Sequence, residues 1–301
     1  MKLSCLHPYI KEMPAEGHAG EMSPRVVFPC GKCPVCQSKI AKDWTLRLQE
    51  ECSHYPGKSV FITLTYNEQN IKKVDGVGVL CKRDVQLFFK RLRIAAQRQY
   101  GKPVDIRYFI IGEYGPHTLR PHYHALLFGL PHDQSTYRLI NKTWQNGFIT
   151  LDEVTQGRIS YVASYMLNFL LSSLDSTRRK YPPFRTMSRR QGIGYRFLTP
   201  DRERFYLKNP NQPIRFRGFL YRFPRYYQDK LFKNYPEIKQ QRQSVAMAYL
   251  KNQQELYFAM YGEMDSNRRK SGQSTVMEEM ISHFLEQYHH QYVFHKLKRR
   301  L

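Results

Sequence analysis

The sequence predicts an α+β protein built on a small antiparallel sheet with helices packed against it. Two of its features predict this class. Short β-type runs alternate with amphipathic segments between residues 60 and 172, and two of the runs are joined by the turn Tyr114-Gly115-Pro116. A turn this short makes its two strands antiparallel. The apolar fraction of 41% in a chain of 301 residues is sufficient for a packed core.

The strands are predicted as short apolar runs bounded by turn residues, and the helices as segments with apolar residues three and four positions apart. The predicted strands are Val60–Tyr66, Ile106–Glu113, His122–Phe128 and Phe148–Leu151. The predicted helices are Gln37–Cys52, Asp84–Tyr100, His132–Trp144 and Arg158–Ser172. From residue 60 the order is β-α-β-β-α-β-α, which is typical of a ferredoxin-like sheet with its helices on one face. The opposite face would then stay open to a ligand.

The strand His122–Phe128 begins with two histidines separated by one residue. In a strand, His122 and His124 point to one face and Tyr123 to the other. Two imidazoles on a rigid strand form half of a metal site. On its own the motif is more often a pair of partly exposed surface histidines, so its context has to decide.

A third metal ligand is expected from a carboxylate near the histidines. Glu113 ends the preceding strand, and neighbouring strands of a hairpin lie about 5 Å apart, so its carboxylate would reach a metal held by both imidazoles. Glu68, just after the first strand, is the alternative, and we favour Glu113. Two nitrogens and one carboxylate oxygen leave coordination positions open, which is characteristic of a catalytic site.

The helix Arg158–Ser172 carries Tyr161 and Tyr165, four residues apart and therefore on the same face. At about 100° per residue, both phenols fall in one narrow arc with the other polar side chains of this helix. The alternative is an amphipathic helix with ordinary interfacial tyrosines. An open metal site beside two phenols suits transesterification of a phosphodiester, in which a tyrosine oxygen attacks the phosphate and no ATP is required.

Cysteines predict a second metal site near the N-terminus, where Cys30, Cys33 and Cys36 form a double CxxC. Because we expect no secretory signal, metal ligation explains this spacing better than disulfides do. Structural zinc needs four ligands, of which Cys5 is the natural fourth and His7 the substitute. Reduced thiols without a metal are the alternative. The other two cysteines have no such spacing and are expected to be ordinary buried thiols.

The formal net charge of +23 and the pI near 9.8 predict a polyanionic partner, either nucleic acid or an anionic membrane surface. No apolar run is long enough to cross a bilayer, and the start of the chain has no signal-peptide core, so we favour nucleic acid and expect no membrane partner. Gly57-Lys58-Ser59 is not a phosphate loop, because the pattern needs a glycine where the chain has Cys52. We therefore expect no ATPase or helicase in this chain.

Three ordered stretches, FITLTY, GEYGPHTLRPHYHALLFG and YVASYMLNFL, resemble the motifs of HUH endonucleases of the rolling-circle replication class. The flanking stretches are similar to the replication initiator proteins of gokushovirus-like microviruses, which are small single-stranded DNA phages. They are PCGKCPVCQSKIAKDWTLRLQEE, MSRRQGIGYRF and FPRYYQDKLF. The resemblance covers most of the chain up to about Phe232.

The resemblance implies an RRM-like HUH nuclease core with a Mg or Mn ion on His122 and His124. It also implies nicking of the viral strand at an origin and covalent attachment of the protein to the 5′ phosphate. Host enzymes would then extend the released 3′ hydroxyl. Tyr161 and Tyr165 would alternate between rounds, so that the displaced strand is cut and rejoined as a circle.

One position departs from the family pattern. Such proteins commonly carry Lys one residue before the second tyrosine, and here that position is Ser164. We hypothesise that Arg158, one turn before Tyr161, supplies the missing positive charge.

Residues 178–190 contain six Lys or Arg and no acid, which suits contacts to DNA phosphates. The candidate DNA-binding residues are Arg158, Arg185, Arg189 and Arg190. A solvated basic loop is an equally good interpretation for any one of them. Two further helices are predicted, Glu237–Tyr261 and Val276–Leu297, with no chemistry of their own. They would form a tail that binds DNA or recruits a host helicase.

The chain is accordingly expected to divide into four regions: a Cys-rich segment and helix at 1–55, the nuclease core at 56–175, a basic DNA-contacting region at 176–235 and a helical tail at 236–301. The expected partners are origin DNA, in single- and double-stranded form, and the host helicase and DNA polymerase, in the cytoplasm of the bacterial host cell. Two other functions stay open: a non-enzymatic, zinc-stabilised RRM-like module that binds nucleic acid, and a single-tyrosine HUH transposase or relaxase.

Overall fold

The computed structural model describes most of the chain. The described residues are Cys5, 9–12, 25–31, 33–115, 118–171, 176–276, 278–280 and 282–283. His7 and most of the predicted helix Val276–Leu297 lie outside them. Within the described residues, no helix combines the length and apolar character needed to span a membrane.

A five-stranded antiparallel sheet forms the centre of the fold, with strand order β8-β3-β7-β6-β9. Its strands are β3 (Ser59–Tyr66), β6 (Arg107–Tyr114), β7 (Pro121–Phe128), β8 (Gly147–Glu153) and β9 (Phe184–Met187). Helices α2 (Lys82–Tyr100), α3 (Gln134–Trp144) and α4 (Gln156–Leu171) complete the order β-α-β-β-α-β-α. The predicted α+β class and the predicted order of elements are confirmed.

Strand β9 is an addition that the sequence did not predict, because its four residues lie in the stretch interpreted as a basic loop. Its edge position is stabilised by pairing along β6, from Gly112 opposite Phe184 to Phe109 opposite Met187. The Phe184 ring packs 6.1 Å from that of Tyr123. A short strand with an arginine at its centre gives too weak an alternation to be recognised in the sequence.

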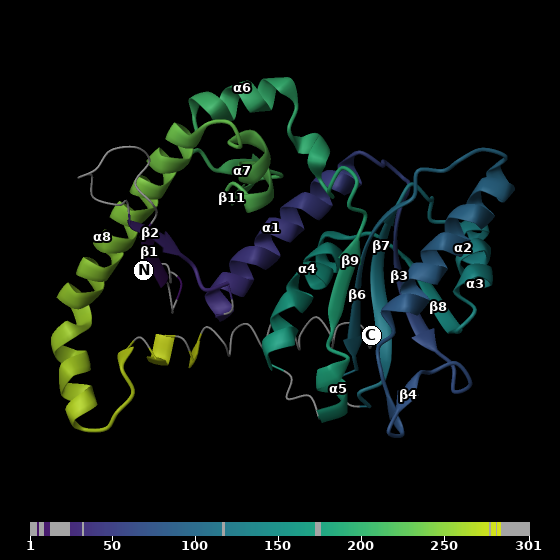
Figure 1. The fold of residues 1–301 in the computed structure, drawn as a ribbon, viewed down its shortest axis with the longest axis horizontal. Coiled ribbons are helices and arrows are strands. Elements are labelled where there is room, and N and C mark those ends of the chain that lie inside the picture. The colour runs from purple at the N-terminus through teal and green to yellow at the C-terminus, as the bar shows by residue number, and fades with distance from the viewer. Residues whose placement is uncertain are drawn as a thin grey trace. The chain divides into compact units, whose positions relative to one another are not determined.

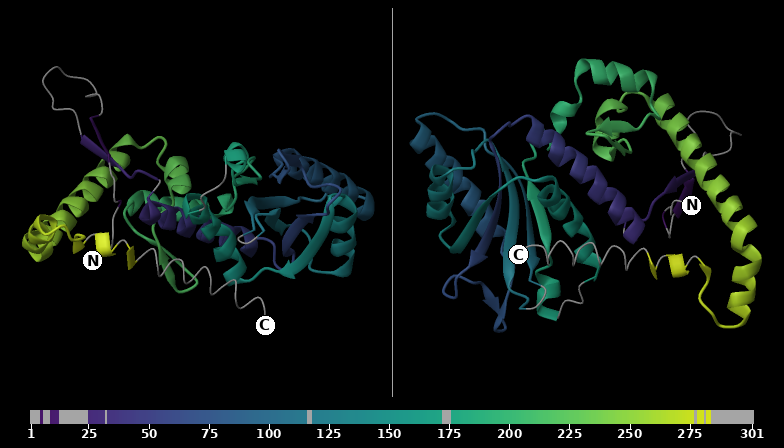
Figure 2. Two further views of the ribbon diagram at one scale, coloured as in Figure 1. Left: turned by 90° about the horizontal axis from the view of Figure 1, so that it is seen from below. Right: turned by 180° about the vertical axis from the view of Figure 1, so that it is seen from behind.

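Helices cover both faces of the sheet, whereas the sequence predicted helices on one face only. Helices α2 and α3 lie on one side and α4 on the other, where it contacts β6 and β7 (Figure 1). Figure 2 shows the same arrangement from behind. The second face needs cover because Phe61, Phe109 and Leu126 point to it, and all three are fully buried. Trp44, from helix α1 (Pro34–Ser53), also packs there, 4.9 Å from the Phe109 ring.

Alternation along β3 separates the apolar core from the second face. Val60, Ile62 and Leu64 are fully buried in the core against α2 and α3. Between them, Thr63 and Thr65 point to the second face and are only half-buried. The polar part of that face therefore begins at the threonines and continues onto β7.

A hydrogen-bonded network of phenols anchors β7 from the core side. The hydroxyls of Tyr66 and Tyr123 lie 2.8 Å apart, and the Tyr66 hydroxyl donates to Asp84 at 2.8 Å. The Cys81 N–H donates to the Tyr123 hydroxyl at 2.9 Å. Burial raises the pKa of both tyrosines well above the ordinary range, so both phenols stay neutral. The network ties the middle of β7 to the start of α2.

Arg107 organises the stretch after β9. This buried side chain donates to a Glu51 carboxylate oxygen and to the backbone oxygens of Arg190 and Gln191. The other Glu51 oxygen accepts from the Gly194 N–H at 2.6 Å. A buried ion pair with these additional hydrogen bonds is well compensated for its loss of water.

The remaining elements are shorter, apart from one long helix. They are β1 (Tyr9–Glu12), β2 (Arg25–Phe28), β4 (Lys73–Val74), β5 (Val77–Gly78), α5 (Ser176–Lys180), η1 (Tyr195–Phe197), α6 (Pro200–Lys208), β10 (Ile214–Phe216), β11 (Phe219–Tyr221), α7 (Arg225–Leu231) and α8 (Pro236–Lys270). Helix α8 contains the predicted helix Glu237–Tyr261 and continues beyond it.

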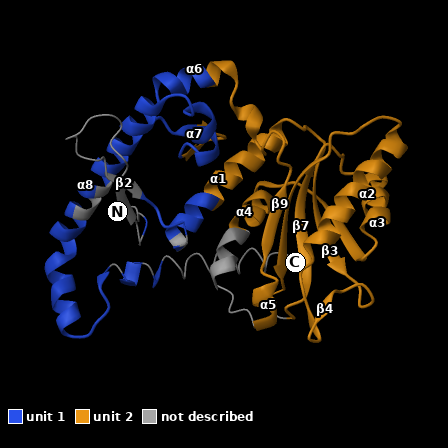
Figure 3. Ribbon diagram, in the orientation of Figure 1, with its two compact units in different colours: residues 1–40, 203–214, 222–301 blue, residues 41–202, 215–221 orange. Residues whose placement is uncertain are grey.

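The chain divides into two compact units (Figure 3). Unit 1 comprises 1–40, 203–214 and 222–301, and unit 2 comprises 41–202 and 215–221. The five-stranded sheet lies in unit 2. Unit 1 contains the β1–β2 pair, α8 and an aromatic cluster in which the Phe223 ring packs 4.6 Å from Tyr206 and 5.8 Å from Phe232.

Replacing Gly129 by Ala should destabilise the fold more than the same change at Gly76. Both glycines have positive φ, of 101° and 75°. A Cβ at Gly129 would clash with the carbonyl oxygen of Asp105, whereas at Gly76 it would meet no atom within 4 Å. We expect a loss in unfolding free energy of roughly 2–5 kcal/mol for Gly129→Ala and about 1 kcal/mol for Gly76→Ala, measured by urea denaturation. Equal losses would contradict this close approach.

Candidate metal centre on the sheet

The register between β6 and β7 brings the three predicted metal ligands together. Glu113 lies directly opposite His122 in this pair. Its Oε1 atom is 2.7 Å from Nε2 of His122 and 3.2 Å from Nε2 of His124. Glu113 and His124 are buried, with 6% and 4% of their surfaces exposed, and His122 is half-buried. The three side chains form one group on the second face of the sheet.

The other ring nitrogen of each histidine is held by the protein. Nδ1 of His122 lies 3.1 Å from the backbone oxygen of Arg120, which can only accept, so the imidazole donates through Nδ1. Nδ1 of His124 lies 3.0 Å from the Thr63 hydroxyl. Such contacts orient histidine ligands and leave Nε2 available on the side of Glu113.

Glu113 is ionised in this environment. Burial acts to raise the pKa of its carboxyl group, but hydrogen bonds from His122 and His124 outweigh burial and leave the pKa below its usual value. An ionised carboxylate is the form that binds a cation.

The donor set and its spacing fit a divalent cation. Two ligands at right angles, each about 2.1 Å from a metal of the size of Mg²⁺, lie about 3 Å apart. The separations of Glu113 Oε1 from the two Nε2 atoms, 2.7 and 3.2 Å, bracket this value. Two imidazoles and one carboxylate are characteristic of sites that leave positions open for other ligands.

Glu68, the alternative third ligand, lies elsewhere. Its side chain is 71% exposed, accepts a hydrogen bond from Arg120 and is 3.9 Å from the Lys73 ammonium. The same Arg120 guanidinium donates to the backbone oxygen of Tyr66 at 2.7 Å. Glu68 therefore forms a surface ion-pair group and is not part of the His–Glu–His group.

Tyr161 lies beside the metal-ligating group. Its ring is 5.5 Å from that of His124, at an interplanar angle of 76°. On α4, Val162 and Ala163 are fully buried, while Tyr161 and Ser164 are half-buried. The polar arc predicted for this helix thus turns Tyr161 toward the second face of the sheet. The side chain of Tyr165 lies outside the part of the structure that can be described.

Two of the four predicted DNA-binding arginines lie on the same face as the histidines. Arg158 pairs with Asp152 at 2.8 Å, and its guanidinium lies 5.7 Å from the Phe61 ring, which stacks at 5.6 Å on His124. Arg185 lies opposite Ile111, which in turn lies opposite His124. Burial lowers the Arg185 pKa, and its guanidinium lies over Trp44.

The other two arginines line a different surface. Arg189 and Arg190 border a groove of about 590 Å³ between α2 and β9, on the core side of the sheet. Lys82 and Arg93 contribute further positive charge to the same groove. The structure therefore separates the four arginines into two groups on opposite sides of the sheet.

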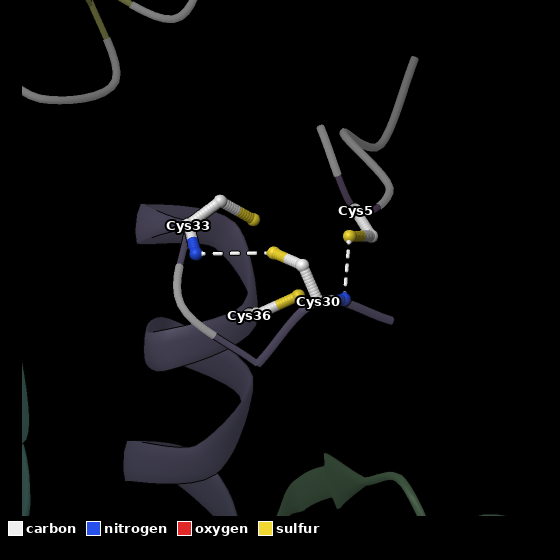
Figure 4. Close-up of side chains that lie close together, drawn as sticks. All are labelled: Cys5, Cys30, Cys33 and Cys36. Carbon is white, nitrogen blue, oxygen red and sulfur yellow. Dashed lines mark hydrogen bonds between the residues drawn. The ribbon is translucent and has the colours of Figure 1, made fainter. Parts of the chain in front are cut away.

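The four N-terminal cysteines converge in unit 1 (Figure 4). Their sulfur atoms all lie within 4.8 Å of one another. The Cys30 N–H donates to the Cys5 sulfur at 3.1 Å, and the Cys33 N–H donates to the Cys30 sulfur at 3.3 Å. Cys33 and Cys36 are buried. All six cysteines of the chain are described, and none is in a disulfide.

Four converging sulfurs, two of which accept backbone N–H groups, fit a tetrahedral metal bound by thiolates. Burial raises the pKa of Cys36 well above its ordinary value, so this thiol stays protonated unless a cation is bound. A soft divalent ion would supply the charge that stabilises the thiolates. Cys5, the predicted fourth ligand, thus lies where the spacing of the other three required it.

Sequence reasoning missed two side chains of the sheet site. Thr63 contacts His124, and Phe61 stacks on its ring. Both lie on β3, and only their alternation in FITLTY could have indicated them, since their proximity to β7 depends on the strand order.

The fold and the site define an α+β protein with a His–Glu–His group able to hold a metal on its sheet. Comparison with known proteins extends this. The family model for the replication-associated protein ORF2 matches residues 59–169, which contain the three ligands and both tyrosines. Replication-associated protein VP4 of Bdellovibrio phage phiMH2K is 31% identical over 70% of this chain and 69% of its own.

Two further relatives have the same character. Replication-associated protein ORF4 of Chlamydia phage 1 is 32% identical over 68% of this chain and 54% of its own. Replication-associated protein ORF2 of Spiroplasma virus 4 is 28% identical over 72% and 73%. The chain therefore belongs to the replication-associated proteins of these small phages, the microvirus-like replication initiators.

A solved structure of the N-terminal nuclease domain of minute virus of mice non-structural protein-1 aligns with 51% of this chain and 73% of that domain. The identity is 10% and the TM-score 0.21, which is too low for the likeness to bear on function.

Proposed function

We propose that this chain starts rolling-circle replication as a metal-dependent endonuclease and strand transferase that nicks the viral strand at its origin. The observation that carries the proposal is the Tyr161 ring, 5.5 Å from the ring of a histidine in the His–Glu–His group. The membership of a replication-initiator family and the net charge of +23 support a DNA substrate.

His122, His124 and Glu113 would hold a Mg or Mn ion. When bound, such an ion neutralises the charge that builds on a phosphate under attack. The backbone oxygen of Arg120 and the hydroxyl of Thr63 keep the two imidazoles oriented for this task.

Tyr161 would be a nucleophile. Its phenol oxygen loses its proton to solvent and attacks the phosphorus of the scissile phosphodiester. A new P–O bond to tyrosine forms while the P–O3′ bond breaks, and the O3′ atom leaves with the electron pair and takes up a proton. The 5′ phosphate remains as a phosphotyrosine ester, and the 3′ hydroxyl is free to be extended.

Tyr165 would be the second nucleophile. With two tyrosines on one helix, one holds the first 5′ phosphate while the other cuts the displaced strand. The new 3′ hydroxyl then attacks the first phosphotyrosine, which releases the phenol and closes the circle. The ester retains the energy of the phosphodiester bond, so no ATP is consumed.

DNA contacts would come from Arg158 and Arg185 on the catalytic face, and from Arg189 and Arg190 in the groove behind it. Arg158 is also our candidate for the positive charge that the family supplies with a lysine at the position of Ser164. Host helicase and DNA polymerase would act on the nicked origin, in the cytoplasm of the bacterial host cell. Cys5, Cys30, Cys33 and Cys36 would hold a structural zinc ion.

Replacing both tyrosines by Phe should abolish the covalent adduct, because no phenol oxygen remains to attack. The assay incubates the chain with labelled single-stranded DNA from the viral-strand origin and Mn, and detects the adduct on a denaturing gel. Each single variant, Tyr161→Phe or Tyr165→Phe, should retain part of the adduct. Tyr249→Phe, at an exposed position on α8, is the matched control. Wild-type chain that forms no adduct with any viral-strand fragment would favour the non-enzymatic binding module. An adduct that depends on one tyrosine alone would favour a transposase or relaxase.

Glu113→Gln should weaken Mn binding at least about tenfold, because the amide loses the negative charge that binds the cation. Glu68→Gln should leave it unchanged. Isothermal titration of both variants with Mn gives the comparison, and circular dichroism checks that each is folded. A loss in the Glu68 variant alone would exchange the two assignments.

Cys36→Ser should lower the zinc content of the purified chain and its melting temperature, since one thiolate ligand is lost. Cys52→Ser should retain both, because that thiol is outside the cluster. Elemental analysis by mass spectrometry measures zinc in each variant. Equal zinc content in the two would remove the cysteines from the metal site.

A further inference from the structure

One cross-strand row of side chains connects the metal-ligating group to the edge of the sheet. Thr65 on β3 lies opposite His122 on β7 and, on its other side, opposite Phe148 on β8. Glu113 lies opposite His122 on the next strand. Directly paired residues point to the same face of a sheet, so Phe148, Thr65, His122 and Glu113 form one line across the second face.

Phe148 is exposed in this line. Its surface is 68% accessible, while Phe61, Phe109 and Phe128 on the same face are fully buried. An aromatic ring left open beside a row of polar groups is the unusual observation here, since such rings are normally covered.

The surface between this ring and the metal ligands is also open. Thr150, next on the same face of β8, is exposed, and Thr63, Thr65 and His122 are half-buried. Phe148 and His122 are two strands apart, which is about 10 Å. That distance is comparable to the span of a nucleotide. A nucleic acid whose phosphate lies at the histidines could therefore lay a neighbouring base on the ring.

We propose that Phe148 is a stacking platform for a nucleobase that flanks the scissile phosphate, on single-stranded DNA. The inference rests on the proposed function and adds a binding residue to it. A single-stranded occupant fits because unpaired bases expose their flat faces to aromatic side chains, whereas a duplex hides them. The threonine hydroxyls along the strip can contact the edges of the base. The net charge of +23 favours this polyanionic occupant over a second copy of the same basic chain.

The platform should act on binding and not on the chemical step. Phe148 touches none of the three ligands and lies across two strands from them. Its removal should raise the dissociation constant for DNA and leave the rate of adduct formation at saturating DNA unchanged.

The test compares DNA binding by four full-length variants through fluorescence anisotropy, with a labelled oligothymidine and with an abasic strand of equal length and charge. Phe148→Ala should weaken oligothymidine binding about 5- to 150-fold, in line with the cost of losing one base–aromatic stack, and should hardly change abasic binding. Phe148→Tyr should restore affinity. Phe219→Ala removes an equally exposed ring, 62% accessible, and should have no effect. Phe148→Trp should be quenched by oligothymidine, against a background of two buried tryptophans.

The outcomes separate this inference from the proposed function. Unchanged oligothymidine affinity in Phe148→Ala, with adduct formation intact in the wild type, would overturn the platform alone. Absence of any adduct in the wild type, with base-dependent binding lost in Phe148→Ala, would overturn the nuclease and keep the platform. Equal weakening for oligothymidine and abasic strand would also overturn stacking. A change in sedimentation of Phe148→Ala without a change in DNA affinity would assign the ring to a contact between copies of the chain.

Discussion

The site depends on the antiparallel register between β6 and β7. In that register Glu113 stands opposite His122, and His124 lies one alternation further along the same face. A slip of one residue would turn both imidazoles to the core. The Tyr66–Tyr123 hydrogen bond on the core side opposes such a slip, because it fixes the one side chain between the histidines. Buried phenols on one face thus keep the metal-ligating group in place on the other.

The two faces of the sheet have different tasks. The face toward α2 and α3 is apolar and provides the core. The second face is apolar only at Phe61, Phe109 and Leu126, where α1 and α4 cover it, and it is polar at the threonines and histidines. Covering just the apolar part brings Tyr161 to the edge of the polar part, beside His124. The position of the proposed nucleophile is therefore a consequence of how this face is buried.

Much of this could be predicted from sequence, because strand alternation and the hairpin around Gly115 determine which side chains share a face. Glu113, His122 and His124 were recognisable for that reason, and Cys5 by the number of ligands a tetrahedral metal needs. The helix on the second face was not predictable, since it is demanded by residues that only the strand order brings together. Strand β9 was missed because its pairing with β6 depends on a distant partner, and Thr63 and Phe148 became significant only with the register in hand.

The central claim is that a tyrosine on α4, beside the His–Glu–His group, becomes covalently joined to DNA. Mass spectrometry of protease-digested adduct tests it most directly, after reaction of the chain with viral-strand origin DNA and Mn. The account predicts a nucleotide on the peptide that contains Tyr161 and Tyr165, with fragment ions that place the phosphate on one of the two phenols. A nucleotide on any other residue would contradict it.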